Sequence, residues 1–402
     1  MIGCQSMKII VIGLPHTMTL DPRREDAFTT CAYTCKAWHL CKMMHDRGHE
    51  VIHLGTEGSE PICTEHVDVG PKAMWQELYG ARKRTEFYEI AENGIYERYM
   101  SVFEHRTRAA IVERCKKDWD AIICIPWGGV QFRAVAGLSQ YIVESGIGYP
   151  NVSANHRVYE SYAWMHFHLG KANQAGGDTW YHVVIPNAFD PSMFGPVVPT
   201  VDKQDYFLYL GRITESKGTQ LACQVAAHLG VPIKIVGQGD PSIFEPPILG
   251  PGVTYQGPVG AKEKNELLRH AKGLFMPTRY VEPFGGVAVE SMMSGCPVIT
   301  TDWGAFTETV IHGYTGFRCH TMAEFVEAAR RVDKIDPEVC RKWATSNYGL
   351  DRVGAMYENY FRSLLELNVV GKEGWTAPEL PWTDLGCLKQ DHSMFGAGIK
   401  AP

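Results

Sequence analysis

The sequence lacks the long apolar run that a membrane-spanning helix needs. No stretch approaches the roughly 20 consecutive apolar residues of such a helix, and no apolar signal-peptide segment opens the chain. Positive charge is also not in excess, because 45 acidic residues against 39 basic ones give a net charge of −6. A broad basic surface for nucleic acid is therefore not indicated. We expect a cytoplasmic protein with no transmembrane segment.

Several short catalytic motifs are absent as well. The chain has no GxxxxGK[ST], HExxH, GxSxG or GxGxxG sequence, which argues against a P-loop enzyme, a zinc protease, a serine hydrolase and a nicotinamide dehydrogenase. Its twelve cysteines form no CxxC pair and no Cys/His cluster with zinc spacing. We interpret them as buried, reduced thiols and predict no metal site.

The chain does have two successive series of apolar strands and helices. Continuous apolar strands that alternate with helices are typical of parallel sheets covered on both faces. Prolines 191, 196 and 199 follow the first series and mark a boundary. We predict an α/β protein with two Rossmann-like domains, residues 7–187 and 188–350, and a ligand site beyond the carboxyl ends of the strands. The expected strands are Met7–Gly13, Glu50–Gly55, Ala121–Pro126, Gly148–His156 and Tyr181–Pro186, then Tyr206–Gly211, Ile233–Gly237, Val253–Gly257, Gly273–Pro277 and Phe317–Cys319.

The most informative stretch lies between Arg279 and Thr301. It has Glu282 in a loop and then Gly285-Gly286, which opens a helix. Two glycines at a helix N-terminus expose backbone N–H groups to an approaching anion. Glu290 lies one turn along, on the same face as the start of the helix. This arrangement suits a sugar nucleotide, with the backbone binding the diphosphate and the carboxylate binding a pair of sugar hydroxyls.

Three weaker pieces also follow strands of the second half. The loop from Gly211 to Gly218 carries Arg212 and Lys217, and two such cations suit a diphosphate. The alternative is that they are solvated surface charges. Gly237-Gln-Gly239 is a glycine turn, and Gly257-Pro-Val259 offers an apolar residue for a nucleobase. Either of these could be a plain turn.

In this order and spacing, the pieces resemble the retaining GT-B glycosyltransferases of family 4, the glycosyltransferase group 1 type. The resemblance covers about residues 180–365 densely and the first half loosely. It implies a GT-B fold, in which two Rossmann-like domains face each other across a cleft. It also implies transfer of a hexose from a nucleotide-diphosphate sugar to a hydroxyl acceptor, without a metal. The matching segments are Val184–Phe194, Tyr209–Ile213 with Lys217-Gly218, Ile235–Asp240, Glu282-x7-Glu290, Gly295–Ile299 and Glu308–Gly316.

The resemblance implies a role for each matched residue. Arg212 and Lys217 would clamp the diphosphate and neutralise its charge as it leaves. Glu282 would hold hydroxyls of the donor sugar, and Glu290 would bind the ribose. The other expected donor-binding residues are Gly211, Gly237, Val259, Phe284, Gly285, Gly286 and Val287.

In the first domain, this family places a histidine after a central strand and close to the donor sugar. His156, at the end of the predicted strand 148–156, is the best match, although it could be a loop or core histidine. His16, after the first strand, is a second candidate on the acceptor side. The family often has a glycine pair in that loop, and residues 14–21 lack one.

Other interpretations of the same residues remain open. Glu282 and Glu290 could form the acid/base pair of a glycosidase, but neither has an evident reason for a raised pKa. An epimerase or a phosphorylase of the same fold would share these motifs, and so would a catalytically silent sugar-nucleotide-binding protein. Asp118-Trp-Asp120 precedes an apolar strand, whereas a metal-binding DxD follows one, so we interpret it as a turn.

The remaining expectations concern substrates and the end of the chain. The nucleotide sugar would be a co-substrate, and we predict no cofactor. UDP-glucose is the first expectation for the donor and GDP-mannose the second. The sequence indicates neither the acceptor, nor the linkage, nor the oligomeric state. Residues 351–402 resemble a C-terminal helix and tail that cross back to the first domain.

Overall fold

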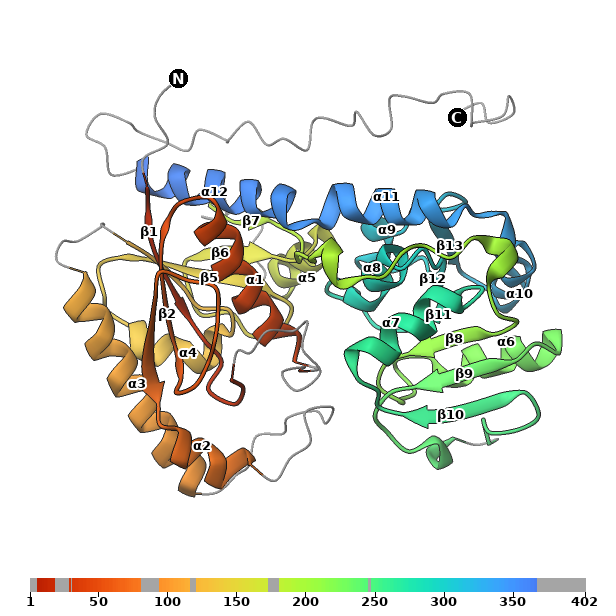
Figure 1. Ribbon diagram of the computed structural model, residues 1–402, viewed down its shortest axis with the longest axis horizontal. Coiled ribbons are helices and arrows are strands. Elements are labelled where there is room, and N and C mark those ends of the chain that lie inside the picture. The colour runs from red at the N-terminus through yellow and green to blue at the C-terminus, as the bar shows by residue number, and fades with distance from the viewer. Residues whose placement is uncertain are drawn as a thin grey trace.

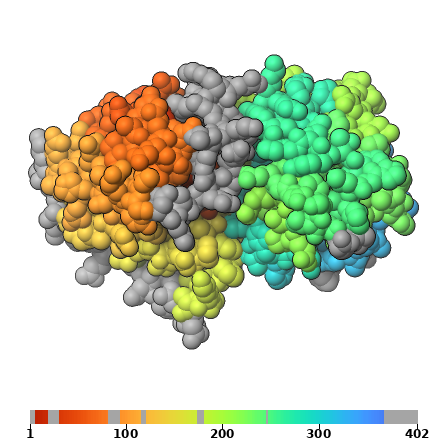
Figure 2. Space-filling view, turned by 90° about the horizontal axis from the view of Figure 1, so that it is seen from below, coloured from red at the N-terminus to blue at the C-terminus, as the bar shows by residue number. Residues whose placement is uncertain are grey.

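The computed structural model describes residues 6–18, 29, 31–80, 94–115, 121–172, 181–244 and 247–366. The tail 371–402 and the Asp118-Trp-Asp120 turn lie outside these residues. Two α/β domains lie side by side (Figure 1). Seen from below, surface from the first half of the chain lies beside surface from the second half (Figure 2). None of the described helices is long and apolar enough to cross a bilayer.

The first domain is built on a parallel sheet with strand order β3-β2-β1-β4-β5-β6-β7. One of its inner strands, β1, is buried from Ile9 to Ile12 because helices cover both faces of the sheet. The strands are β1 Lys8–Ile12, β2 Glu50–Thr56, β3 Glu65–Gly70, β4 Ile122–Cys124, β5 Tyr141–Ile147, β6 His156–Tyr159 and β7 Val183–Val184. The helices are α1 Ala32–Asp46, α2 Lys72–Tyr79, α3 Gly94–Arg114, α4 Gly128–Val135 and α5 Tyr162–Lys171.

The second domain repeats this construction with strand order β10-β9-β8-β11-β12-β13. All its neighbouring strands are parallel, so their carboxyl ends meet at one edge. The strands are β8 Phe207–Leu210, β9 Ile233–Val236, β10 Val253–Gly257, β11 Leu274–Met276, β12 Val298–Thr301 and β13 Gly316–Cys319. The helices are α6 Thr219–Leu229, α7 Ala261–His270, α8 Gly286–Met293, α9 Phe306–Thr309, α10 Met322–Arg331 and α11 Pro337–Tyr348, with short 3-10 turns at 191–193, 200–202, 241–243 and 332–334.

Helix α12, Leu350–Glu366, returns from the second domain to the first (Figure 1). Its apolar residues Val353, Tyr357, Tyr360 and Leu364 recur at helical spacing and join the core beneath β1 and α1. At its polar edge, Glu358 pairs with Arg47 at the end of α1, with 3.0 Å between Oε2 and Nη1. The helix thus connects the end of the second domain to the core of the first.

The strand predicted at 148–156 is wrong. The chain forms β5 at Tyr141–Ile147, then a loop, and β6 begins only at His156. The polar Glu144 inside β5 concealed this strand. Its carboxylate is fully buried and accepts hydrogen bonds from the N–H groups of Ser153 and Ala154 and from the Tyr149 hydroxyl, at 2.7–2.8 Å. The loop 149–155 wraps around this carboxylate, so it cannot extend the strand.

Candidate active site

The carboxyl ends of the second sheet bring the predicted cationic loop next to the predicted glutamate loop. Gly211 and Gly237 end neighbouring strands, and their N–H groups continue the ladder to Val236 and Gly257. The Arg279 N–H donates to the carbonyl of Ser216 at 2.8 Å, which joins the two loops directly. Residues about seventy positions apart in the chain therefore share one edge of the sheet.

Gly218 is required where α6 approaches β11. Its φ is +74°, and a Cβ atom there would lie 2.1 Å from the carbonyl oxygen of Pro277. Only glycine combines this backbone conformation with so close an approach. The contact places Lys217, the preceding residue, above the end of β11.

Lys217 and Glu282 form an ion pair at this edge. The distance from Nζ to Oε2 is 2.7 Å, and the two side chains are 18% and 11% exposed. The ring of Tyr280, which the sequence interpretation missed, lies 4.9 Å from the same ammonium. Burial raises the pKa of Tyr280, as does the Glu282 carboxylate, while the charge of Arg212 opposes this shift. Arg212 therefore lies near the pair, with an exposed side chain.

Glu290 is held separately by a cation from another helix. Its Oε1 lies 2.6 Å from Nζ of Lys264 on α7, and both side chains are about one-fifth exposed. The sequence interpretation missed Lys264, because the two residues are 26 positions apart and no spacing pattern relates them. The site thus has two carboxylates, each with its own lysine partner.

Gly285 and Gly286 open α8 between these two ion pairs. Gly285 has a φ of +76°, and a Cβ atom there would lie 2.5 Å from the ring of Phe306. At Gly286 the nearest atom to an added Cβ would be 3.6 Å away, on Phe189, so that face is less crowded. Phe284 is 2% exposed and its ring stacks with Phe189, so only its backbone could reach a ligand. Val287 and Val259 are partly buried and pack against the core of the second domain.

The first turn of α1 lies opposite this edge, in the other domain. Burial raises the pKa of Tyr33, with further effects from Cys31 and from the Glu282 carboxylate. Burial likewise raises the pKa of Cys35 to about 12, and the charges of Lys264 and Glu290 also act on this thiol. Tyr33 and Cys35 thus interact electrostatically with charged groups of the second domain. The sequence interpretation named no site residue in this turn.

His16 lies at the same edge of the first domain, after β1. Its Nε2 is 3.4 Å from the Cys31 sulfur, and its ring meets the Trp127 ring edge-on at 4.8 Å. Its placement on the acceptor side stays a prediction.

His156 lies at the opposite edge, which corrects the prediction that it follows a strand. It begins β6, pairs with Val143 and packs between the rings of Tyr141 and Tyr181. Burial lowers its pKa, as for a core histidine. Ser161, which touches the glutamate loop, is five residues further on, or about 16 Å along an extended chain. The error arose because residues 152–155 are a loop.

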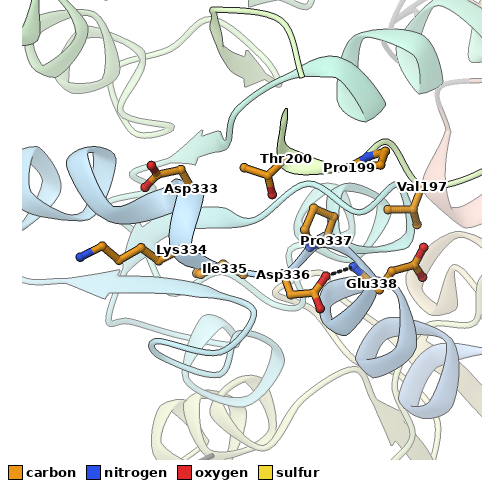
Figure 3. A pocket seen from close by; sticks show the side chains of 9 residues that line it. All are labelled: Val197, Pro199, Thr200, Asp333, Lys334, Ile335, Asp336, Pro337 and Glu338. Carbon is orange, nitrogen blue, oxygen red and sulfur yellow. Dashed lines mark hydrogen bonds between the residues drawn. The ribbon is translucent and has the colours of Figure 1, made fainter. Parts of the chain in front are cut away.

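A cavity of about 280 Å³ lies outside this region, between residues 197–200 and 333–338 (Figure 3). Its lining includes none of the predicted donor-binding residues. Within the described residues, no group of three or more His, Cys, Asp or Glu side chains could hold a metal ion.

Residues 204–333 match the family model described as Glycosyl transferases group 1. This part of the chain is therefore similar to the group 1 glycosyl transferases. The match spans β8 to β13 and includes every predicted donor-binding residue. Assignment to family 4 and a retaining mechanism remain predictions.

Curated relatives align mainly with part of the chain. Glycogen synthase of Mycobacterium tuberculosis is 31% identical over 138 residues, which are 31% of this chain and 33% of the relative. D-inositol 3-phosphate glycosyltransferase of Pseudarthrobacter chlorophenolicus is 26% identical over 232 residues, 50% of this chain and 53% of the relative. An uncharacterized 41.2 kDa protein in the cps region of Klebsiella pneumoniae is 28% identical, over 39% and 46% of the two chains. The alignments span one-third to about half of these relatives.

Solved structures match almost the whole chain and confirm the predicted GT-B fold. AviGT4, a glycosyltransferase involved in avilamycin A biosynthesis, has a TM-score of 0.63 at 19% identity, covering 89% of this chain and 98% of that one. Sucrose-phosphate synthase from Thermosynechococcus elongatus has a TM-score of 0.63 at 18% identity, covering 90% and 100%. Anabaena HepE in complex with UDP and glucose has a TM-score of 0.59 at 14% identity, covering 89% and 100%. Likeness at this level of identity shows the fold alone.

Proposed function

We propose that the chain is a glycosyltransferase that moves a hexose from a nucleotide-diphosphate sugar to a hydroxyl acceptor. The observation that carries the proposal is the pair of ion pairs on either side of the α8 N-terminus. Lys217–Glu282 precedes Gly285-Gly286, and Lys264–Glu290 lies one turn beyond it. A diphosphate needs positive charge and N–H donors, and a sugar needs carboxylates.

Each part of the donor has a matching part of this edge. Lys217 and Arg212 supply the charge that neutralises the diphosphate as it leaves, and the N-terminus of α8 supplies backbone donors. Glu290 binds the ribose hydroxyls, and Glu282 binds hydroxyls of the hexose. These cations and donors can stabilise the leaving group without a metal, so metal independence is part of the proposal.

The reaction breaks the bond between the anomeric carbon and the diphosphate oxygen and forms one to the acceptor oxygen. The acceptor attacks from the face that the diphosphate leaves, so the anomeric configuration is retained. The acceptor proton passes to a phosphate oxygen, and no enzyme base is required. In this proposal the first turn of α1, whose Tyr33 and Cys35 interact electrostatically with the two glutamates, shields the donor from water.

UDP-glucose is the proposed donor, with GDP-mannose as the second candidate. Two observations support a glucosyl nucleotide. Glycogen synthase and sucrose-phosphate synthase are among the proteins similar to this chain. The structurally similar HepE was solved with UDP and glucose.

Donor turnover tests the proposal. The purified chain is incubated with each nucleotide sugar, with and without a panel of saccharide and small-molecule acceptors, and release of nucleoside diphosphate is measured. We expect release with one donor and its loss in Glu290→Ala. Lys272→Met, which removes an exposed lysine paired with Asp205 in the same domain, is the control and should turn over normally. No release from any donor under any acceptor condition would contradict the proposal.

A further inference from the structure

Residues 160–163, which form the turn after β6 and the start of α5, connect the first domain to the glutamate loop of the second. The Ser161 hydroxyl donates to the carbonyl oxygen of Pro283 at 2.6 Å. The Ser161 Oγ also accepts from the N–H of Trp164 at 3.1 Å and so caps α5. Pro283 directly follows Glu282, the residue proposed to hold the donor sugar. A first-domain side chain thus contacts the peptide next to a donor residue.

A second-domain carboxylate completes this connection. Glu308 on α9 accepts hydrogen bonds from the N–H groups of Tyr162 at 2.9 Å and Ala163 at 2.8 Å. These amides open α5 and have no partner within their own helix, and a negative charge is favoured there. Just before α9, the Ala305 N–H donates to the carbonyl of Glu282 at 3.0 Å. Glu282 is therefore flanked by two contacts, one through Pro283 and one through the segment that carries Glu308.

The turn is also fixed within the first domain. The Glu160 carboxylate contacts the ammonium of Lys36 on α1, and these side chains are 4% and 13% exposed. Lys36 also donates to the carbonyl of Gly146 at the end of β5, at 3.2 Å. A buried ion pair is costly to break. The turn is therefore rigid relative to the sheet that carries it.

We propose that this turn, and Ser161 in particular, is a positioning element that sets Glu282 for the donor sugar. The inference rests on the proposed function for the identity of the ligand. Glu290 and Lys264 both belong to the second domain, and the nucleotide they are proposed to bind does not depend on the turn. Binding of the hexose therefore depends on contact between the domains, whereas binding of the nucleotide does not.

The test compares two ligands in four variants. Calorimetry gives the Kd of UDP and of UDP-glucose, or of the pair that the wild type binds, for Ser161→Ala, Ser161→Thr and Glu308→Gln. The matched control is Asp336→Ala, which removes another helix cap: Asp336 accepts from the Glu338 N–H at 2.9 Å, beside the cavity in Figure 3. Both alanine variants lose a cap, but only Ser161→Ala loses the contact with Pro283.

We expect Ser161→Ala and Glu308→Gln to raise the Kd of the nucleotide sugar by about fivefold to tenfold, which is the effect of losing one hydrogen bond. The Kd of the nucleotide should stay unchanged. Ser161→Thr keeps the hydroxyl, so the ratio of the nucleotide-sugar Kd to the nucleotide Kd should be that of the wild type. Equal weakening of both ligands, or a ratio no different from that of Asp336→Ala, would overturn the inference.

Hydrogen exchange separates failure of this inference from failure of the proposed function. In the ligand-free protein, amides of residues 281–287 should exchange faster in Ser161→Ala than in Asp336→Ala. If no nucleotide binds the wild type, the proposed function fails, and this exchange difference still tests the turn. Equal exchange in the two variants would refute the positioning role.

Discussion

Replacing Lys217 by methionine separates the diphosphate role from the sugar role of the donor site. In the structure the ammonium pairs with Glu282 at 2.7 Å, and both side chains are mostly buried. A bound diphosphate would draw this ammonium toward its own charge. A hydrogen bond to a charged group contributes about 1.5–3 kcal/mol, or about 10- to 150-fold in Kd. In calorimetry, Lys217→Met should raise the Kd of UDP, or of whichever nucleoside diphosphate the wild type binds, by that factor.

Glu282→Gln should lower the Kd of the nucleoside diphosphate or leave it unchanged. Without the carboxylate, Lys217 no longer exchanges an ion pair for the phosphate, so the nucleotide does not bind more weakly. The nucleotide sugar should lose affinity relative to the nucleotide, because the carboxylate oxygen that would accept a hydrogen bond from a sugar hydroxyl is lost. Lys272→Met serves as the control, since its exposed pair contributes at most about 1 kcal/mol to stability. Wild-type UDP affinity in a folded Lys217→Met variant would refute the reasoning.

Two further predictions concern stability. Gly285→Ala should lower the free energy of unfolding by about 2–5 kcal/mol, because this residue has a left-handed backbone and an added Cβ would clash with Phe306. Gly286→Ala should have a normal free energy of unfolding in urea titrations but should bind nucleotide more weakly. Similar stability for the two variants would contradict this. Burial lowers the pKa of His39 to about 4 and of His53 to about 3. Both stay neutral when folded, but in the unfolded chain they bind protons below about pH 6.5. Unfolding free energy should therefore fall from pH 6.5 toward pH 4, by about 1.4 kcal/mol per unit for each histidine; a constant value from pH 7 to 5 would count against it.

Much of the second domain could be predicted because its signals are local. Apolar runs such as 274–276 and 298–301 are buried strands, and the glycines at 218 and 285 adopt the backbone that only glycine tolerates readily. The loop with Glu282 and the helix with Glu290 are next to each other in the chain. Their proximity therefore follows from secondary structure alone.

The first domain was harder to predict because its polar residues have distant partners. Glu144 interrupts an apolar strand, and its hydrogen-bond partners come from a loop nine and ten residues later. This concealed β5 and moved His156 from the amino end of a strand to an expected carboxyl end.

The ion pairs and interdomain contacts had no sequence signal for the same reason. The partners are far apart in the sequence: 26 residues separate Lys264 from Glu290, 124 separate Lys36 from Glu160, and 146 separate Tyr162 from Glu308. Ser161 is a favoured cap residue before a helix, but the aromatic helix that follows it was not predicted.

A thermal-shift panel of UDP, GDP, ADP and their hexoses tests the central claim most directly, because a bound ligand stabilises the folded state by mass action. The account predicts that one nucleotide family raises Tm with concentration. At 100 times Kd the stabilisation is about 2.7 kcal/mol, which corresponds to a shift of about 3 °C if all 402 residues unfold together. Glu290→Ala should lose most of this shift. No stabilisation by any nucleotide, or an equal shift in Glu290→Ala, would contradict the account.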